Sequence, residues 1–187
     1  RFVAASDWRI DGLRFEGRLV AAAAIWINDG RSGADAGISG SSRRISVIDC
    51  HFVDIRRGER QDTHSIRIDG DASDVLIRGC VSDTSSADAV QIQNATRVVI
   101  EDCHFFIKRP FPADDPWDNT GENGIDIKRA DDVVVRRCVI EGFQEVDSEN
   151  IESTSAGAEG IVVHKFGVVG LLVEDCTFRA NRTDIKI

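Results

Sequence analysis

The sequence predicts an all-β chain that coils into stacked parallel strands, and two repeated phrases carry this prediction. The first phrase is an alternating apolar stretch, two mostly polar residues, a cysteine and, in most copies, an apolar residue two positions later. It occurs at Cys50, Cys80, Cys103, Cys138 and Cys176, which are 30, 23, 35 and 38 residues apart. A repeat of this length is typical of stacked structural units.

The second phrase lies between successive cysteines and reads HSIRID, DAVQIQ, NGIDIK, EGIVVH and TDIKI. Its period-two alternation predicts a short strand. With WRIDGLRF and AIWIN as an irregular first unit, the pattern predicts about six coils, each burying apolar residues against its neighbours. We expect one domain over residues 1–187. Because the chain contains no Met, we also expect a processed chain or a piece of a longer one, with a further domain or further coils at its ends.

We expect the five cysteines to form one buried column of unpaired thiols. Residues stacked in adjacent coils lie roughly 4.8 Å apart, but their Cα–Cβ bonds run parallel, which does not suit a disulfide. Unpaired cysteines then pack as small hydrophobic residues. No two cysteines are close in sequence, so zinc ligation has no support. His51 and His104 follow two of these cysteines, and we expect them to stack on each other at the surface, remote from the groove.

Composition excludes two classes of partner. The formal net charge is −9, whereas binding to a nucleic-acid backbone needs clustered Lys and Arg. The longest apolar stretch, residues 19–27, is too short to span a bilayer. We therefore expect neither nucleic acid nor a membrane span. An acidic polysaccharide is not excluded, since a local cationic strip can override the net charge.

The repeats resemble those of right-handed parallel β-helix proteins, the pectate-lyase-like superfold, although members of that superfold often carry Asn where this chain has Cys. The resemblance covers residues 8–187 and implies three parallel sheets, with the active groove on the third strand of each coil. Long loops at 56–64, 108–123 and 144–159 precede these strands and would wall the groove. The superfold includes lyases, hydrolases, epimerases, adhesins and phage spikes, so the fold alone does not fix the function.

Alternation along the third strands predicts three outward columns of side chains that run across the coils. The first column is small: Ser65, Ala89, Gly124 and Gly160. The second is Arg67, Gln91, Asp126, Val162 and Lys186. The third is Asp69, Gln93, Lys128 and His164. We expect the small residues to leave room for a ligand beside a chemically mixed polar patch.

Lys128 and His164 are predicted to stack roughly 4.8 Å apart, with Asp126 on the same face. Two adjacent cations lower each other's pKa, which moves one toward the range of a general base. A polysaccharide lyase needs such a base and an acid to remove the proton next to a uronate carboxylate and to protonate the leaving oxygen. We assign these catalytic roles to Lys128, His164 and Asp126. The predicted substrate-binding residues are Arg67, Gln91, Gln93, Asp69 and Trp117.

The segment GENGIDIKRADDVVVRRCVIEGF followed by EGIVVHK resembles the alginate and dermatan lyase group of the superfold. This resemblance implies that Lys128 is the base and that nearby acidic residues bind Ca²⁺, for which Glu122, Asp126 and Glu159 are the candidates. The assisting Arg of that group is His164 here. The implied function is β-elimination in an acidic, uronate-containing polysaccharide by a secreted, periplasmic or cell-surface enzyme.

Several alternatives remain open from the sequence. A uronate epimerase would share the first proton abstraction. A glycoside hydrolase is less favoured, because its two carboxylates would have to be Asp69 and Asp126, two coils apart. The alternative of another class is a non-catalytic β-helix for carbohydrate binding, adhesion or a spike. In that case the charged columns would be solvated or cross-strand polar networks, and the Trp117 loop would be an acidic surface loop.

Overall fold

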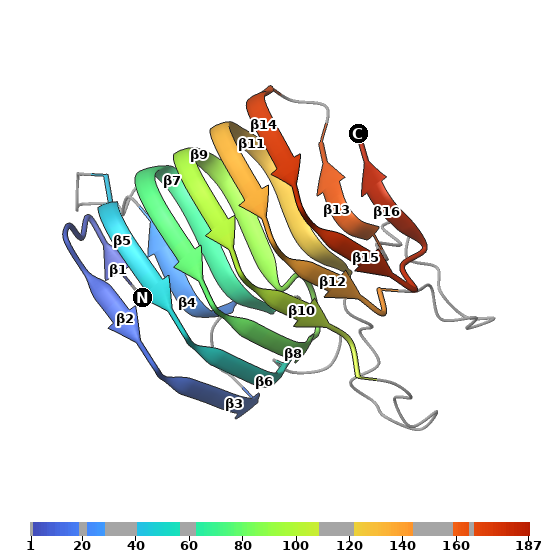
Figure 1. Cartoon of the computed structure of the whole chain (residues 1–187). Coiled ribbons are helices and arrows are strands. Elements are labelled where there is room, and N and C mark those ends of the chain that lie inside the picture. The colour runs from blue at the N-terminus through green and yellow to red at the C-terminus, as the bar shows by residue number, and fades with distance from the viewer. Residues whose placement is uncertain are drawn as a thin grey trace.

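The computed structural model describes residues 2–18, 22–28, 41–56, 63–108, 122–143, 159–164 and 167–187. Within these ranges the secondary structure is entirely β-strand, and every strand pair is parallel. The coils stack along one axis, with the first and last coils at opposite ends (Figure 1). The prediction of an all-β parallel β-helix is confirmed. The described ranges contain no helix that could cross a membrane.

Each coil contributes strands to three faces. Face 1 begins with β1 (Phe2–Val3) and β4 (Ala23–Asn28). The predicted third strands follow on the same face, in the first parts of β7 (His64–Arg78), β9 (Val90–Glu101) and β11 (Asn123–Arg136) and in β13 (Glu159–Val163) and β16 (Thr183–Lys186). Face 2 holds β2 (Arg9–Asp11), β5 (Arg43–Ile48), the second parts of β7, β9 and β11, and β14 (Val168–Glu174). Face 3 holds β3 (Arg14–Arg18), β6 (His51–Arg56), β8 (Val81–Ser85), β10 (His104–Phe106), β12 (Val139–Glu141) and β15 (Thr177–Arg179).

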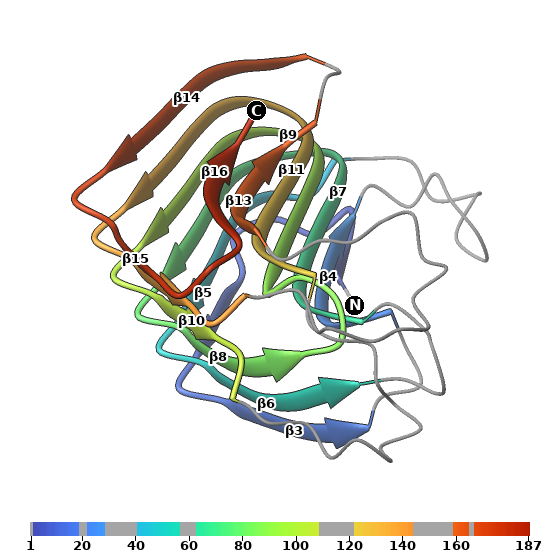
Figure 2. The ribbon, with the colours of Figure 1, turned by 90° about the vertical axis from the view of Figure 1, so that its right-hand side faces the viewer.

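Faces 1 and 2 form one sheet. Its order is β1-β4-β7-β9-β11-β13-β16. In addition, β5 pairs with the second part of β7, β2 pairs with β5, and β14 pairs with the second part of β11. The strands β7, β9 and β11 therefore bend around a corner without ending, as the end-on view shows (Figure 2). Face 3 is a separate six-stranded sheet of order β15-β12-β10-β8-β6-β3. The interior enclosed by the three faces is the hydrophobic core.

The cysteine column stands at the turn between faces 2 and 3, and its thiols are unpaired. Each thiol lies within hydrogen-bonding distance of two carbonyl oxygens, one two residues earlier and one in the preceding coil. For Cys103 these are Glu101 O at 3.2 Å and Ile77 O at 3.8 Å. The predicted column of free thiols is confirmed for its first four members, which are buried. Cys176 is only half-buried, because in the described residues no further coil stacks on β14 and β15.

The residue before each cysteine has a left-handed backbone, which explains the polar pair in the repeated phrase. Its φ is 49° at Asp49, 65° at Gly79, 56° at Asp102, 52° at Arg137 and 52° at Asp175. Asp and Gly tolerate this conformation better than most residues. A side chain at Gly79 would also collide with the Asp49 carboxyl group, which would then have to move.

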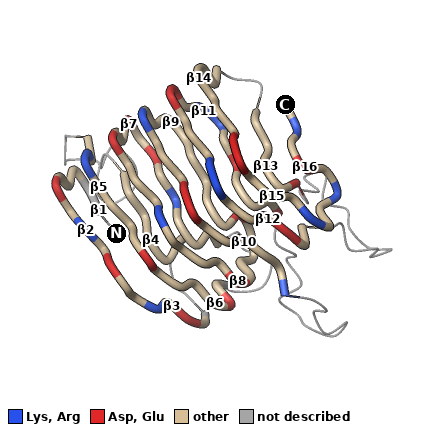
Figure 3. Tube along the Cα trace, in the orientation of Figure 1, with Lys and Arg blue, Asp and Glu red and all other residues tan. Residues whose placement is uncertain are grey.

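A second column of left-handed residues lies where faces 1 and 2 meet, and its charges alternate. Asp7, Arg44, Asp74, Arg97 and Asp132 follow one another across the coils with φ between 54° and 62°. Arg44 pairs with Asp7 at 2.5 Å and Arg97 with Asp74 at 2.6 Å. Figure 3 shows the alternation of basic and acidic residues along this edge. Exposed pairs of this kind contribute little individually, but they favour the correct register of the coils.

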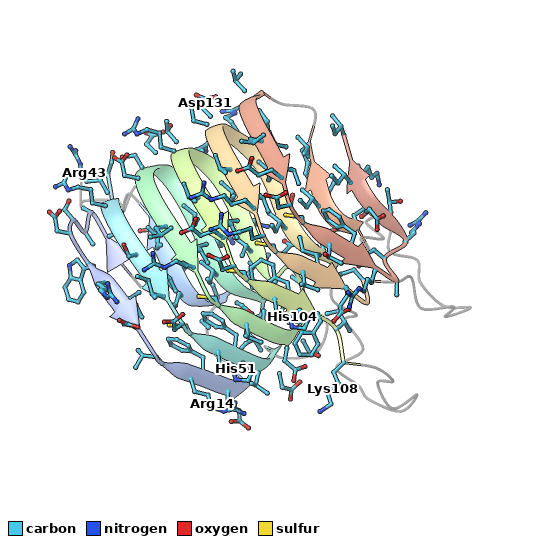
Figure 4. The ribbon with its side chains drawn as sticks, in the orientation of Figure 1. Arg14, Arg43, His51, His104, Lys108 and Asp131 are labelled. Atoms are coloured by element: carbon cyan, nitrogen blue, oxygen red, sulfur yellow. The ribbon has the colours of Figure 1, made fainter. Side chains whose placement is uncertain are left out.

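The expected stacking of His51 on His104 is wrong. Val81 lies between them in the register of face 3, one coil from each. His51 Nδ1 instead lies 2.9 Å from Arg14 Nη1, and His104 Nε2 lies 2.7 Å from Glu141 Oε1. Figure 4 shows the two imidazoles apart on this face. The prediction failed because β8 carries Val at this position.

Candidate active site

The strands of face 1 align the second predicted column as expected. Across the coils the register joins Trp26, Arg67, Gln91, Asp126, Val162 and Lys186. Alternation on each strand places Ile66, Ile92 and Ile127 in the core. The intervening side chains therefore lie on the outer side of the face. This column supplies the polar groups at the centre of the candidate site.

The small first column does not line a groove, and that prediction is wrong. Ser65 is buried, with its hydroxyl 2.8 Å from the buried hydroxyl of Ser82 on face 3. A Cβ at Gly124 would lie 2.5 Å from Ile140 Cγ2, also on face 3. The strands begin at a corner where face 3 approaches closely, so these positions face the interior. Their small size serves packing between the faces.

The third column is interrupted by a bulge at Lys128. Asp69 pairs with Gln93 as predicted, but Gln93 pairs with Arg129, and the register shifts between Ile127 and Arg129. Lys128 is therefore the extra residue of β11. Bulges redirect a side chain and are frequent beside functional sites. The Lys128 amine nevertheless lies beside Asp126, two residues earlier on the same strand.

Asp126 lies at the centre of the cluster. Its Oδ2 is 3.3 Å from Lys128 Nζ and its Oδ1 is 3.0 Å from His164 Nε2. Lys128 and His164 are 40% and 47% exposed, whereas the Asp126 side chain is only 3% exposed. The structure thus brings the three predicted catalytic residues together. Both basic groups contact one carboxylate that is buried, whereas the sequence predicts an exposed Asp126 on the same face.

The electrostatics of Asp126 are dominated by burial. Burial raises the pKa of the Asp126 carboxyl group above its ordinary value of 3.8, and the neighbouring charge of Asp88 raises it further. Lys128 and His164 favour the ionised form and act in the opposite direction. Buried carboxyl groups held between opposing influences of this kind are common at functional sites.

A fourth column of buried polar residues was missed by the sequence analysis. It stands at or just before the first residue of the face 1 strands and consists of His64, Asp88, Asn123 and Glu159, of which the sequence predicts only Glu159 as a site residue. Each is at most 5% exposed. The signal was present in the sequence, as a polar residue directly before the small residue of each strand phrase. It was interpreted as the end of a loop, because alternation applies only once the strand has begun.

Within this column Asp88 is fully buried and contacts three side chains. Its Oδ2 is 3.2 Å from His64 Nδ1, and its Oδ1 accepts a hydrogen bond of 2.8 Å from Asn123 Nδ2. Gln91 Nε2 lies 3.4 Å from Asp88 Oδ2 and 3.5 Å from Asp126 Oδ2. Gln91, predicted to bind substrate, is itself buried. Its amide therefore links the fourth column to the centre of the site.

Arg67 and Asp69, predicted to bind substrate, form a separate cluster with Trp26. Asp69 Oδ2 accepts hydrogen bonds from Trp26 Nε1 at 2.7 Å and from Arg67 Nε at 2.9 Å. The Arg67 guanidinium lies 5.2 Å from the centre of the Trp26 ring. Arg67 is 25% exposed, and Gln93 beside Asp69 is half-buried. This cluster lies on the same face as Asp126, with Gln91 between them.

Two of the three acidic residues expected to bind Ca²⁺, Asp126 and Glu159, already pair with basic side chains. The oxygens of Asp126 contact Lys128 and His164, and Glu159 Oε1 is 3.0 Å from Lys186 Nζ. A divalent cation would have to displace these basic groups. Among the described residues, no three His, Cys, Asp or Glu side chains form a group that could hold a metal ion. We therefore assign no catalytic step to calcium.

The remaining predicted features lie outside the described residues. These are Trp117 and the central parts of the three loops, at 57–62, 109–121 and 144–158. Glu122 lies at the border of one loop, where its backbone N–H donates to Ala87 O at 3.1 Å.

Comparison with known proteins gives one match. Residues 5–186 match the family model described as right-handed β-helix region. Neither the curated proteins nor the solved structures include a significant match. The resemblance to alginate and dermatan lyases is therefore not supported at the level of that group. Nearly the whole sequence matches the family, and the parallel coils agree with it, so the chain belongs to the right-handed β-helix family.

Proposed function

We propose that this β-helix cleaves uronate-containing polysaccharides by β-elimination at the cluster formed by Asp126, Lys128 and His164. The observation that carries the proposal is the pairing of one buried carboxylate with two basic groups that remain partly exposed. Such an arrangement holds an amine and an imidazole in fixed positions while leaving both accessible to a polymer. Proton transfer by positioned side chains is what the reaction requires.

The roles follow from the chemistry of elimination. Lys128 as the free amine accepts the proton from the carbon next to the uronate carboxylate. The electrons of that C–H bond form a carbon–carbon double bond, and the bond from the adjacent carbon to the glycosidic oxygen breaks. His164 gives its proton to the departing oxygen. Asp126 orients both groups and stabilises their charged forms. Arg67 and Gln93, on the same face, are the candidates for contacting the sugar chain.

The charges of face 1 restrict how the polymer would bind. Each Lys or Arg of the second and third columns already has an acidic partner: Arg67 has Asp69, Lys128 has Asp126 and Lys186 has Glu159. The described face is therefore not a cationic strip. Binding of an acidic polymer must rely on hydrogen bonds and on exchange of these ion pairs. A polymer-degrading role also implies a location outside the cytoplasm, at the cell surface or beyond it.

The pairing of each of these basic side chains with an acidic partner favours the second candidate function, a non-catalytic carbohydrate-binding or adhesion module. In that case the ion pairs only stabilise the coil register. A uronate epimerase is a third outcome, since it shares the abstraction of the proton but leaves the glycosidic bond intact. The three possibilities differ in their products, so one set of assays separates them.

The test is formation of unsaturated product, measured as absorbance near 235 nm on alginate, pectate and glycosaminoglycans, with Ca²⁺ and with a chelator. We expect Lys128→Ala to lose roughly 10²- to 10⁴-fold in rate and to keep its polymer affinity within about tenfold. Lys186→Ala is the matched control, because Lys186 also pairs with a buried carboxylate on this face. Its rate should change far less.

Three results would contradict parts of the proposal. If the wild type forms no unsaturated product from any of these polymers but inverts a uronate centre, it is an epimerase. If it binds a polymer and changes nothing, the binding-module function replaces the enzyme. If Lys128→Ala and Lys186→Ala lose equal activity, Lys128 is not the base.

A further inference from the structure

The buried acid Asp88 is not needed for any step of the proposed elimination, yet it lies beside the site. It is fully buried, and an ionised carboxylate in such a position must be compensated by hydrogen bonds or charge. Asn123 supplies a bond of 2.8 Å, and His64 and Gln91 lie within 3.2 and 3.4 Å. These partners come from three successive strands, so Asp88 connects three coils at one corner.

Gln91 carries this connection outward to Asp126. Its Nε2 faces one oxygen of Asp88 and one of Asp126, at 3.4 and 3.5 Å. Both neighbours of this amide are hydrogen-bond acceptors, so its NH₂ group must point toward them. If the amide were flipped, its carbonyl oxygen would face the two carboxylates. The register pairs Gln91 with Asp126 directly. The orientation of the Gln91 amide is thus determined by the two carboxylates together.

We propose that Asp88 is a positioning residue of the site, which fixes the Gln91 amide and through it the Asp126 carboxylate that holds Lys128 and His164. The consequence for catalysis rests on the function proposed above; the consequence for the position of His164 does not. A displaced Asp126 would move both basic groups, and misplacement by about 1 Å can cost 10²-fold in rate.

The experiment uses Asp88→Asn, Gln91→Met and the double variant, with Asp69→Asn as control. Met has the length of Gln but no amide. Asp69 is another acid of face 1, whose partners are Trp26 and Arg67. The first readout is the set of imidazole ¹⁵N signals at fixed pH. The chain has four histidines, and His164→Gln identifies the signals of His164.

We expect the His164 signals to shift in Asp88→Asn and in Gln91→Met and to stay in place in Asp69→Asn. Asp88→Asn should shift the His164 signals less when Gln91 is already Met than in the wild type, because effects transmitted through one residue are not additive and only the direct effect of the Asp88 charge on Asp126 remains. The second readout is the elimination rate. We expect kcat to fall about tenfold or more in either single variant, with KM unchanged within about twofold, and Asp88→Asn to lower kcat less when Gln91 is already Met.

Unchanged His164 signals in folded Asp88→Asn or folded Gln91→Met would overturn the proposal. So would an effect of Asp88→Asn that persists in full when Gln91 is already Met. If Asp88→Asn does not fold, Gln91→Met alone decides. A wild type without lyase activity whose His164 signals respond as described contradicts the proposed reaction and leaves the positioning role intact.

Discussion

Asp126 is subject to two opposing influences, burial and pairing with basic groups. A carboxyl group whose pKa is higher in the folded protein than in the unfolded chain contributes most stability below its unfolded pKa, where both states are protonated. That contribution is lost as the pH rises through the folded value. For Asp126 the unfolded value is 3.8, and the folded value is raised by burial. The residue therefore favours the folded state less at neutral pH than at acidic pH.

We predict that the stability of Asp126→Asn relative to the wild type increases between pH 3 and pH 8, because the amide cannot ionise. Denaturant unfolding at both pH values measures this difference. Asp102→Asn is the control of opposite sign. Hydrogen bonds from Arg137 lower the pKa of Asp102, so the relative stability of that variant should decrease over the same range. A change in the same direction for both variants would contradict the assignment.

At the scale of single residues, the sequence predicts the site where side chains alternate along a strand. Arg67, Gln91 and Asp126 occupy the predicted column. The failures occur where alternation no longer applies. Asp88 precedes its strand, and a register shift at Lys128 pairs Gln93 with Arg129 in place of the predicted Lys128. The apolar pattern of β9 does not mark where the strand begins. The apolar pattern of β11 does not reveal that the strand contains an extra residue.

At the scale of the strands, the two phrases predicted separate short strands, whereas β7, β9 and β11 each run through faces 1 and 2. Strand pairing resumes after a register shift at the corner, at Ala72 with Ala95 and at Ala95 with Ala130. These alanines are buried and give the corner a small, regular interior. Whether a strand ends or bends depends on this backbone path, which the apolar pattern does not encode.

The inward small column provides the prediction at this scale. Gly124→Ala places a methyl group 2.5 Å from both Gly160 O and Ile140 Cγ2. Face 1 and face 3 must then separate locally, and we expect a loss of about 1 to 3 kcal/mol in the free energy of unfolding. Thermal and denaturant unfolding measure it. Ala89→Gly is the comparison, since Ala89 occupies the same column directly before β9 and its methyl group is already accommodated in the buried corner. Unchanged stability of Gly124→Ala would show that the corner has space for a side chain.

At the scale of the whole molecule, stability is distributed along the stack, because each coil contacts only its neighbours. The middle coils are covered on both sides, and their core residues are close to fully buried. The last described coil is covered on one side. Val169 on β14 is 65% exposed and Ile185 on β16 is 39% exposed. In a protein of these 187 residues, we expect local opening to begin at this coil.

The cysteine column can be used to measure the order in which the coils open, because every coil from the second onward carries one thiol. We predict that a thiol reagent labels Cys176 in the native protein, while Cys80, Cys103 and Cys138 react only on unfolding and five thiols react in the denatured chain. Cys176 is half-buried and the others are buried. Burial raises the pKa of the Cys176 thiol, so its reaction should be slower than that of a free cysteine.

Cys50 is the internal control for an effect of chain ends. It lies in the second coil but is covered by the first, with its thiol 3.9 Å from Ile10 O on β2. We expect Cys50 to be protected in the native state like the middle cysteines, and hydrogen exchange to be fastest in β14, β15 and β16. If Cys50 reacts as fast as Cys176, the first coil opens as readily as the last. Protection of a thiol would then depend on how far its coil lies from either end of the stack. It would not depend on the covering of Cys50 by β2 and β3.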